Sequence, residues 1–233
     1  MASLLVLWDV DGTLVDANGS GLHLYQLAFT DLFGGPLPRP GSMAGRTDRA
    51  IALEVLTLAG VADPVSQVRA FHDALAWHAP QAADLIRATG RVLPGAASAI
   101  AALAGGRLVQ SLLTGNLRPL AEVKLSALGL TDHLDLAVGA YGDASEDRAD
   151  LVHLARKNAA AAYREDFGGR ATVVVGDTPR DVEAALRTGA RAVGVATGEY
   201  STADLAAAGA HAVLADLTDT SRAVAAILGP PSS

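Results

Sequence analysis

Three groups of polar residues each follow an apolar run that has the length of a β-strand. Asp9 and Asp11 follow the run Leu4–Trp8, Thr114–Asn116 follows a second run, and Asp177 ends a third. Carboxylates, hydroxyls and backbone amides are the groups that hold magnesium ions and phosphate. The carboxyl ends of parallel strands lie along one edge of a sheet, so the three groups can converge on one ligand.

The two carboxylates of the first group are separated by one residue. Side chains at i and i+2 of an extended chain point the same way, so Asp9 and Asp11 can face one ligand while Val10 faces the core. Gly12 can adopt a positive φ or let a ligand approach the backbone closely. The alternative is that both Asp residues only open a surface turn.

The other two groups suit a metal ion and a phosphate. Asp177 and Asp9 would form, with water, an oxygen-rich site for Mg²⁺. Thr114 offers a hydroxyl ahead of a helix, and the amides of Gly115 and Asn116 can cradle a phosphate at that helix N-terminus. Plain helix capping stays open as the role of Asn116.

Asp181, four positions after Asp177, has two interpretations. It can support the same metal site, or it can serve only at the start of a helix. The second interpretation is natural because Thr178 fits the N-cap position and Pro179 the first helical position. The sequence leaves both open.

The elements that position these groups differ between two parts of the chain. From residue 91 on, strands expected at 108–113, 134–138, 172–175, 192–195 and 212–214 alternate with helices, as in a parallel sheet with right-handed crossovers. Between residues 17 and 90, apolar residues recur at helical spacing and no strand is indicated. We therefore expect an α/β fold: a core domain of residues 1–16 and 91–233, with helices on both faces of its sheet, and an inserted helical domain of residues 17–90.

Composition narrows the class of protein. The 233 residues carry a net charge of −7, half of them are hydrophobic, and none is cysteine. The acidic balance argues against binding to nucleic acid or to an anionic membrane surface, and thiolate chemistry is excluded. No run approaches the roughly 18 apolar residues that a membrane span needs, so a cytoplasmic protein is expected.

The ordered set of groups resembles motifs I, II and IV of the haloacid dehalogenase-like (HAD) hydrolase superfamily. Motif I is Asp9–Thr13, motif II is Thr114, and motif IV is Gly176–Asp181. The resemblance covers essentially the whole chain, and the helical insertion is similar to the C1 cap of phosphoglycolate phosphatase-like members. It implies a Rossmann-like core, an all-helical cap and phosphoryl transfer that depends on Mg²⁺.

The resemblance also implies a role for each matching residue. Asp9 would be the nucleophile that forms an aspartyl-phosphate, and Asp11 would protonate the leaving alkoxide and then accept a proton from water. The metal ion would be held by Asp9, Asp177 and the backbone carbonyl of Asp11, with Asp181 in support. Motif II Thr114 would bind the phosphate. Further phosphate contacts are expected from Gly12, Thr13, Gly115 and Asn116.

Motif III departs from the family pattern, which places a lysine after the third strand. The chain's two lysines, Lys124 and Lys157, lie roughly 15 Å and 13 Å along their helices at 1.5 Å per residue, so both are expected to point away from the site. Arg148 stands at a helix start that matches the motif position, and it can supply the same charge with bidentate geometry. The alternative is a surface pair between Arg148 and Glu146 or Asp150.

The insertion contains one residue that we expect to contact the substrate. Met43–Asp48 resembles the loop that such caps lower over the substrate. Arg46 in this loop would contact the group that the phosphate ester carries. A solvated loop arginine is the alternative.

These residues together predict a Mg²⁺-dependent phosphatase of small phosphate monoesters, such as phosphoglycolate or a sugar phosphate. A phosphomutase of the β-phosphoglucomutase kind is the alternative, because it shares the motifs. A non-catalytic phosphate-binding protein is less favoured, since both Asp9 and Asp11 are intact. The expected partner is a small phosphorylated metabolite, and the protein is expected to be a monomer or a homodimer.

Overall fold

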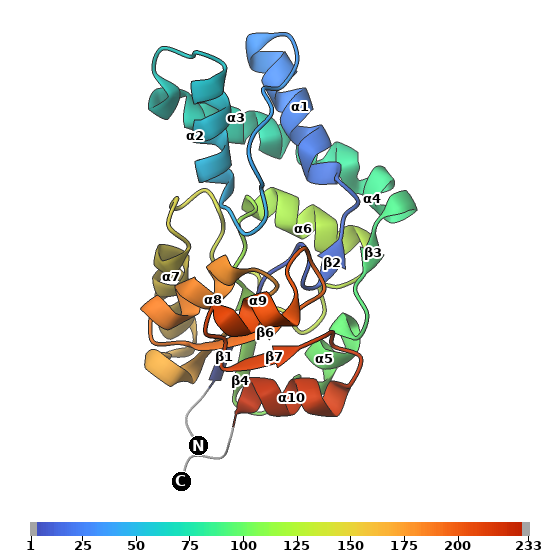
Figure 1. Ribbon diagram of the computed structural model, residues 1–233, viewed down its shortest axis with the longest axis vertical. Helices are drawn as coiled ribbons and strands as arrows, with labels where there is room; N and C mark the ends of the chain where they lie inside the picture. Colours follow the sequence, from blue (N-terminus) through green and yellow to red (C-terminus); the bar gives the residue numbers. More distant parts are fainter. Residues whose placement is uncertain (1–3, 230–233) are drawn as a thin grey trace.

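The core of the molecule is a five-stranded parallel sheet. The computed structural model describes residues 4–229. In the spatial order β4-β1-β5-β6-β7, the strands are Leu108–Leu112, Leu4–Trp8, Thr172–Gly176, Arg191–Val195 and Ala212–Leu214 (Figure 1). Strand β1 pairs in parallel with β4 on one side and with β5 on the other. The three strands that end on polar groups are therefore neighbours.

Helices cover both faces of this sheet, as the sequence predicts. Side chains alternate along β1, so Val6 and Trp8 face one helical layer and Leu5 and Leu7 face the other. The first layer holds α5, α6 and α10, at Ala96–Ala102, Arg118–Ala127 and Thr220–Leu228. The second holds α7, α8 and α9, at Arg148–Tyr163, Pro179–Arg187 and Thr202–Ala207, and a 3₁₀ turn at Gly169–Ala171 precedes β5. Burial on both faces accounts for the continuous apolar run of β1.

The strand predicted at residues 134–138 is wrong. The Asp135 carboxylate accepts a hydrogen bond from the amide of Ala137 at 3.0 Å, which closes a turn in place of an extended segment. Among the described residues, the backbone of strand β4 pairs with this part of the chain only through a hydrogen bond from the Asp135 amide to the Gln110 carbonyl at 2.8 Å and an isolated bridge between Leu113 and Ala140. Strand β4 is therefore an edge of the sheet.

Between β1 and β4 the chain forms a separate group of helices. Helices α1 to α4 span Ser20–Phe33, Asp48–Leu58, Pro64–His78 and Ala83–Thr89, with a 3₁₀ turn at Ala79–Ala82 before α4. The antiparallel pair β2 (Val15–Asp16) and β3 (Arg91–Val92) lies where the chain leaves and re-enters the core. The helices share a hydrophobic cluster that reaches Leu117 and Leu120 at the start of α6. They lie above the carboxyl edge of the sheet in Figure 1.

The division into a core domain and a helical domain stays a prediction. The ends of the predicted core range, residues 1–3 and 230–233, lie outside the described residues. Within residues 4–229 no helix has the length and apolar character that crossing a membrane requires.

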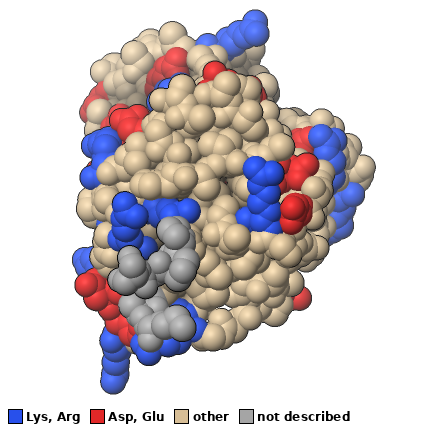
Figure 2. All heavy atoms as spheres, turned by 60° about the horizontal axis from the view of Figure 1, so that its bottom comes forward, with Lys and Arg blue, Asp and Glu red and all other residues tan. Residues whose placement is uncertain are grey.

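Charged side chains on the face shown in Figure 2 are mixed in sign. Basic and acidic residues are interspersed there, and a broad uncharged area lies between them. This face is therefore not the uniformly basic surface that a nucleic acid backbone binds.

Candidate active site

Asp9, Asp177 and Asp181 form an acidic centre at the carboxyl edge of the sheet. Asp9 directly follows β1, Asp177 directly follows β5, and Asp181 lies in the first turn of α8. One carboxylate oxygen of each lies within 4.8 Å of the others, and all three residues are buried. Three segments far apart in the sequence thus bring their carboxylates to one point.

The charge of this centre is unbalanced. Burial raises the pKa of Asp9 well above the usual range for aspartic acid, although the nearby Arg148 opposes the shift. Burial and the carboxylates of Asp9 and Asp181 raise the pKa of Asp177 in the same way. Three carboxylates against one guanidinium favour binding of a divalent cation, and an all-oxygen donor set suits Mg²⁺.

Arg148 is the first residue of α7, and its side chain enters the acidic centre. Its Nη2 lies 2.8 Å from Asp9 Oδ1 and 2.6 Å from Asp181 Oδ1. Only 6% of the side chain is exposed, so the surface pair considered for Arg148 is wrong. Its buried Nε–H has no acceptor among the described residues.

Asp181 has the helix-start role that the sequence left open, and its metal-supporting role stays a prediction. Its Oδ2 accepts hydrogen bonds from the Thr178 amide at 3.1 Å and the Thr178 hydroxyl at 2.7 Å, which forms part of a capping box at the start of α8. Its Oδ1 faces Arg148 without hydrogen-bond geometry. A lone pair of Oδ1 therefore remains available to a metal ion.

The backbone around Asp177 is closely fitted. Gly12 has a φ of 79°, and a Cβ at this position would lie 2.4 Å from Asp177 Oδ2. A Cβ on Gly198, in the loop after β6, would lie 1.8 Å from the same oxygen. Thr13 donates its hydroxyl to Asp177 Oδ1 at 3.0 Å. Gly12 and Thr13 thus fix the position of the Asp177 carboxylate. Gly198 could not be predicted from the sequence, because a glycine in a loop after a weakly predicted strand has no distinctive pattern.

The Thr114–Asn116 turn after β4 faces Asp11. The buried Thr114 Oγ1 accepts hydrogen bonds from the Asn116 amide at 3.2 Å and from Asn116 Nδ2 at 2.8 Å. Asn116 Nδ2 also donates to Asp11 Oδ2 at 2.7 Å. The capping role considered for Asn116 is wrong, because α6 begins at Arg118 with Leu117 as its N-cap.

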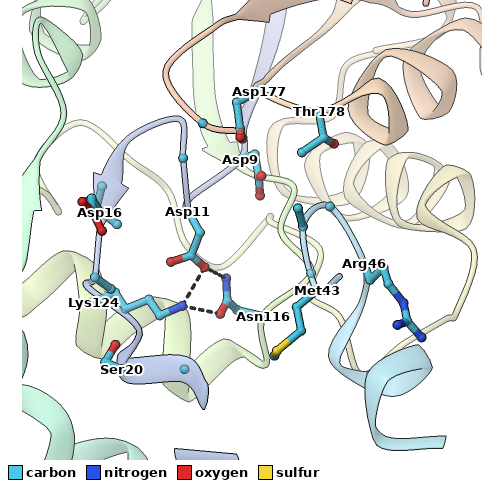
Figure 3. Close-up of a pocket in the computed structure, with 18 of the residues that line it drawn as sticks. Asp9, Asp11, Asp16, Ser20, Met43, Arg46, Asn116, Lys124, Asp177 and Thr178 are labelled. Atoms are coloured by element: carbon cyan, nitrogen blue, oxygen red, sulfur yellow. Dashed lines mark hydrogen bonds and ion pairs between the residues drawn. The ribbon is translucent and has the colours of Figure 1, made fainter. Parts of the chain in front are cut away.

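Lys124 lies in the site, so the prediction that its side chain points away from the site is wrong. Its ammonium group lies 2.6 Å from Asp11 Oδ2 and 2.7 Å from Asn116 Oδ1 (Figure 3). Helix α6 begins only at Arg118, so the helical rise was counted over loop residues. Helical side chains also lean toward the N-terminus, which returns a long lysine to the sheet edge. Lys157 on α7 is exposed, as expected.

The loop Met43–Asp48 reaches the core with its backbone. Arg46 pairs with Glu54 and donates to the Ala50 carbonyl at 3.2 Å, so its guanidinium turns away from the acidic centre in Figure 3. Its side chain is 19% exposed, which also excludes the solvated alternative. The Arg46 carbonyl oxygen lies so close to the core that a Cβ on Gly115 would stand 1.9 Å from it.

Asp48 joins this loop to the core. Its buried carboxylate accepts hydrogen bonds from the Tyr25 hydroxyl at 2.7 Å and from the Leu117 amide at 2.6 Å. Its own amide donates to the Gly115 carbonyl at 2.7 Å. Burial raises the pKa of Asp48 to about 6. The sequence did not single out this residue, because an aspartate in the first turn of a helix is common.

A cavity of about 480 Å³ lies between the sheet edge and the group of helices. Asp9, Asp11 and Arg148 line it from the core, and Ser20 and Met43 line it from the other side. Its volume suits a small molecule.

Comparisons with known proteins give the family. The haloacid dehalogenase-like hydrolase profile matches residues 6–186. A protein named probable phosphatase IndB, from Dickeya dadantii, is 29% identical over 98% of this chain and 96% of its own. A plasmid-encoded phosphoglycolate phosphatase from Cupriavidus necator is 30% identical over 97% of this chain and 93% of its own.

A solved structure of a hydrolase from Pseudomonas syringae shares the fold. It matches with a TM-score of 0.66 at 23% identity, over 94% of this chain and 96% of its own. The match of the family profile begins in β1 and ends in α8, so it includes all three members of the acidic centre. The chain therefore belongs to the haloacid dehalogenase-like hydrolase family.

Proposed function

We propose that the protein is a Mg²⁺-dependent phosphatase that hydrolyses small phosphate monoesters through an aspartyl-phosphate on Asp9. The observation that carries this proposal is the buried Asp9 carboxylate, 2.8 Å from the Arg148 guanidinium and open to the cavity. A carboxylate held by a fixed cation, beside two further carboxylates, is suited to attack on phosphorus. The names of the two relatives, both phosphatases, support the same reaction class.

In the proposed reaction, an oxygen of Asp9 attacks the phosphorus and the ester P–O bond breaks. Arg148 balances the negative charge that gathers on the phosphoryl oxygens. Asp11 protonates the leaving oxygen and then accepts a proton from the water that releases phosphate. A Mg²⁺ held by Asp9, Asp177 and the Asp11 backbone carbonyl, with Asp181 in support, would supply further neutralisation of phosphoryl charge.

The proposal assigns residues 17–90 to a cap that closes over the bound ester. Two hydrogen bonds support this assignment, because they join the two sides of the cavity: the Leu117 amide donates to the Asp48 carboxylate, and the Asp48 amide donates to the Gly115 carbonyl. The cavity volume of about 480 Å³ supports a small phosphorylated metabolite, such as phosphoglycolate or a sugar phosphate. We propose that the protein acts on this metabolite in the cytoplasm.

The test is turnover of p-nitrophenyl phosphate by the purified protein with Mg²⁺ and with EDTA. We expect release of p-nitrophenol that needs the metal and that Asp9→Asn abolishes without loss of the fold. A panel of small phosphate esters then identifies the preferred substrate, and a requirement for a sugar bisphosphate activator would instead indicate a mutase. Metal-independent turnover, or full activity of Asp9→Asn, would contradict the proposal.

A further inference from the structure

Lys124 is a buried cation for which the proposed reaction gives no role. Only 4% of its side chain is exposed, and its ammonium group contacts Asp11 Oδ2 at 2.6 Å and Asn116 Oδ1 at 2.7 Å. Taking an ammonium group out of water is costly, so buried lysines are rare unless they are paired. The pairing partner here is the residue to which we assign proton transfer.

The two oxygens of Asp11 have different surroundings. Oδ2 accepts from Lys124 Nζ and, at 2.7 Å, from Asn116 Nδ2, as the dashed lines in Figure 3 show. No hydrogen bond to Oδ1 is formed within residues 4–229. The Asp11 side chain is 46% exposed and lines the cavity. Oδ1 is therefore the oxygen that remains for a ligand.

The same network reaches the phosphate side of the site. Asn116 Nδ2 also donates to the buried Thr114 Oγ1 at 2.8 Å, and Asn116 Oδ1 accepts from Lys124. Asn116 thus has each of its polar side-chain atoms occupied, which fixes its orientation. Lys124 bridges Asn116 Oδ1 and Asp11 Oδ2, so loss of its ammonium group removes one contact from each and leaves Asn116 Nδ2 as the remaining donor to Asp11 Oδ2.

We propose that Lys124 is a positioning residue that, together with Asn116, determines which oxygen of Asp11 exchanges protons with the substrate. The proposal rests on the phosphatase function given above. Because two donors occupy Oδ2, the acid form of Asp11 carries its proton on Oδ1, the oxygen that remains for a ligand. Neither donor needs to touch the substrate for this.

The proton then follows a balanced path through Oδ1. As Asp9 bonds to phosphorus and the ester P–O bond breaks, the Oδ1 proton moves to the leaving oxygen and an alcohol departs. A water molecule then returns a proton to Oδ1 and bonds to phosphorus. The P–O bond to Asp9 breaks, which restores the Asp9 carboxylate and releases inorganic phosphate.

Arg148 does not supply this function. Its Nη2 is held by Asp9, Asp181 and the Leu113 carbonyl, the last at 3.0 Å. The site therefore has two buried cations with separate partners, one for the nucleophile and one for the acid and base. Loss of Lys124 should harm only the steps that need proton transfer.

The test compares two aryl phosphates of similar shape and different leaving-group acidity. p-Nitrophenyl phosphate releases a stable phenolate and needs little proton donation, whereas phenyl phosphate needs a proton for its poorer leaving group. We expect Lys124→Met to leave single-turnover cleavage of p-nitrophenyl phosphate within about threefold of wild type. Cleavage of phenyl phosphate should fall by about 100-fold, the lower end of what general acid catalysis contributes, with KM unchanged.

Three further variants separate positioning from a structural role. Lys157→Met, at the exposed lysine of α7, is the matched control and should behave as wild type with both esters. Lys124→Arg keeps the buried charge and the fold, and should recover at least about tenfold of the loss with phenyl phosphate. In an Asp11→Asn background, Lys124→Met should change neither rate further, because Lys124 acts through Asp11.

Two outcomes would overturn the inference: equal losses with both esters, or a further loss in the Asp11→Asn background. If Lys124→Met does not fold, Lys124→Arg takes its place. A folded Lys124→Arg enzyme that loses the same factor of activity with both esters contradicts the inference, and a larger loss with phenyl phosphate than with p-nitrophenyl phosphate supports it. Failure of wild type to cleave either ester would instead contradict the proposed phosphatase function.

Discussion

At the scale of single residues, the site combines buried carboxylates with two buried cations. Arg148 contacts Asp9 and Asp181, and Lys124 contacts Asp11. Asp9 is buried, so loss of Arg148 would leave its carboxylate with a large desolvation cost and should have a strong effect. Asp11 is partly exposed, so loss of Lys124 should affect mainly its proton transfer.

Arg148 provides the first prediction. Arg148→Ala should lower kcat/KM for p-nitrophenyl phosphate by about 100- to 1,000-fold, the range seen when one preorganised electrostatic donor is lost. Arg148→Lys should keep part of the activity, because it retains the charge but its single ammonium group cannot also replace the hydrogen bonds from Arg148 to the Gly45 and Leu113 carbonyls. Arg170→Ala, at an exposed arginine, is the control and should have wild-type rates. An Arg148→Ala enzyme with near wild-type kcat/KM would show that the motif III cation is elsewhere.

Sequence reasoning worked at residue scale where a residue stands next to a strand end or a helix start. Asp9, Asp177 and Arg148 are of this kind, because the end of a strand or helix fixes their place within one or two residues. Lys124 and Asp48 were not found, because their contacts depend on how α6 and α2 pack, and no local pattern encodes that. Arg46 was found as a loop residue, but its pairing with Glu54 needs the folded helix α2.

At the scale of elements, the backbone of the Met43–Asp48 loop packs closely against the backbone of the turn after β4. The Arg46 carbonyl approaches Gly115, and the Gly115 carbonyl approaches Gly142, where a Cβ would lie 1.7 Å from it. Both glycines are therefore required by close backbone approach.

Gly115→Ala should separate the loop from the core. Its Cβ would lie 1.9 Å from the Arg46 carbonyl oxygen, so the loop must shift. We expect kcat to fall by at least about tenfold, since small displacements of positioning groups are costly in catalysis. Gly41→Ala, whose Cβ would have an ordinary 3.6 Å contact with Glu54, should keep its activity. A fully active Gly115→Ala enzyme would mean that this contact does not matter for turnover.

Asp48 makes the packing of α2 on the core dependent on pH. Its pKa in the folded protein, about 6, lies above the ordinary value of 3.8. The folded state then binds the proton more tightly than the unfolded state, so stability falls as pH rises from about 4 to 6 and stays lower above that. Asp48→Asn should reduce this pH-dependent decrease in the free energy of unfolding by about 2–3 kcal/mol.

Chemical unfolding between pH 4 and 8 measures the effect of Asp48→Asn. Asp132→Asn, at an exposed aspartate, serves as the control. An equally steep fall in Asp48→Asn and wild type would exclude Asp48 as its source.

The sequence predicts the strands of the main sheet and the longer helices, and it misses the two-residue strands and one short helix. The strands β1, β4, β5, β6 and β7 and the helices α1, α2 and α3 were expected from apolar periodicity. The predicted strand at 134–138 is a turn, because an apolar run does not reveal that Asp135 will hydrogen-bond its own backbone. The two-residue strands β2 and β3 and the short helix α4 have too few residues to show a period.

At the scale of the whole molecule, we expect the acidic centre to link stability to pH and, under the proposed function, to a bound metal ion. Asp9 and Asp177 have raised pKa values, so the metal-free folded state holds more protons than the unfolded state above the ordinary aspartate pKa. Stability of the metal-free protein should therefore fall as pH rises from about 4 toward neutrality. A bound cation replaces those protons.

Magnesium should stabilise the molecule more at pH 8 than at pH 5. At a Mg²⁺ concentration 100 times the Kd of the site, the free energy of unfolding should rise by about 2.7 kcal/mol. Thermal unfolding with and without Mg²⁺ measures it. Asp177→Asn should remove most of the gain, because this residue is one of the three carboxylates of the centre. A gain that is the same in Asp177→Asn and wild type would mean that the metal binds elsewhere.

The central claim is that Asp9 carries the phosphoryl group during turnover. Asp11→Asn should slow the water step, because its amide cannot accept the proton, so the phosphorylated enzyme should accumulate with p-nitrophenyl phosphate and Mg²⁺. Acid quenching, digestion and mass spectrometry should then find one phosphoryl group on the peptide that contains Asp9, and none in a variant that also carries Asp9→Asn. The contradicting result is steady turnover by the wild-type enzyme while the Asp9 peptide stays unmodified at every quench time in both wild type and Asp11→Asn.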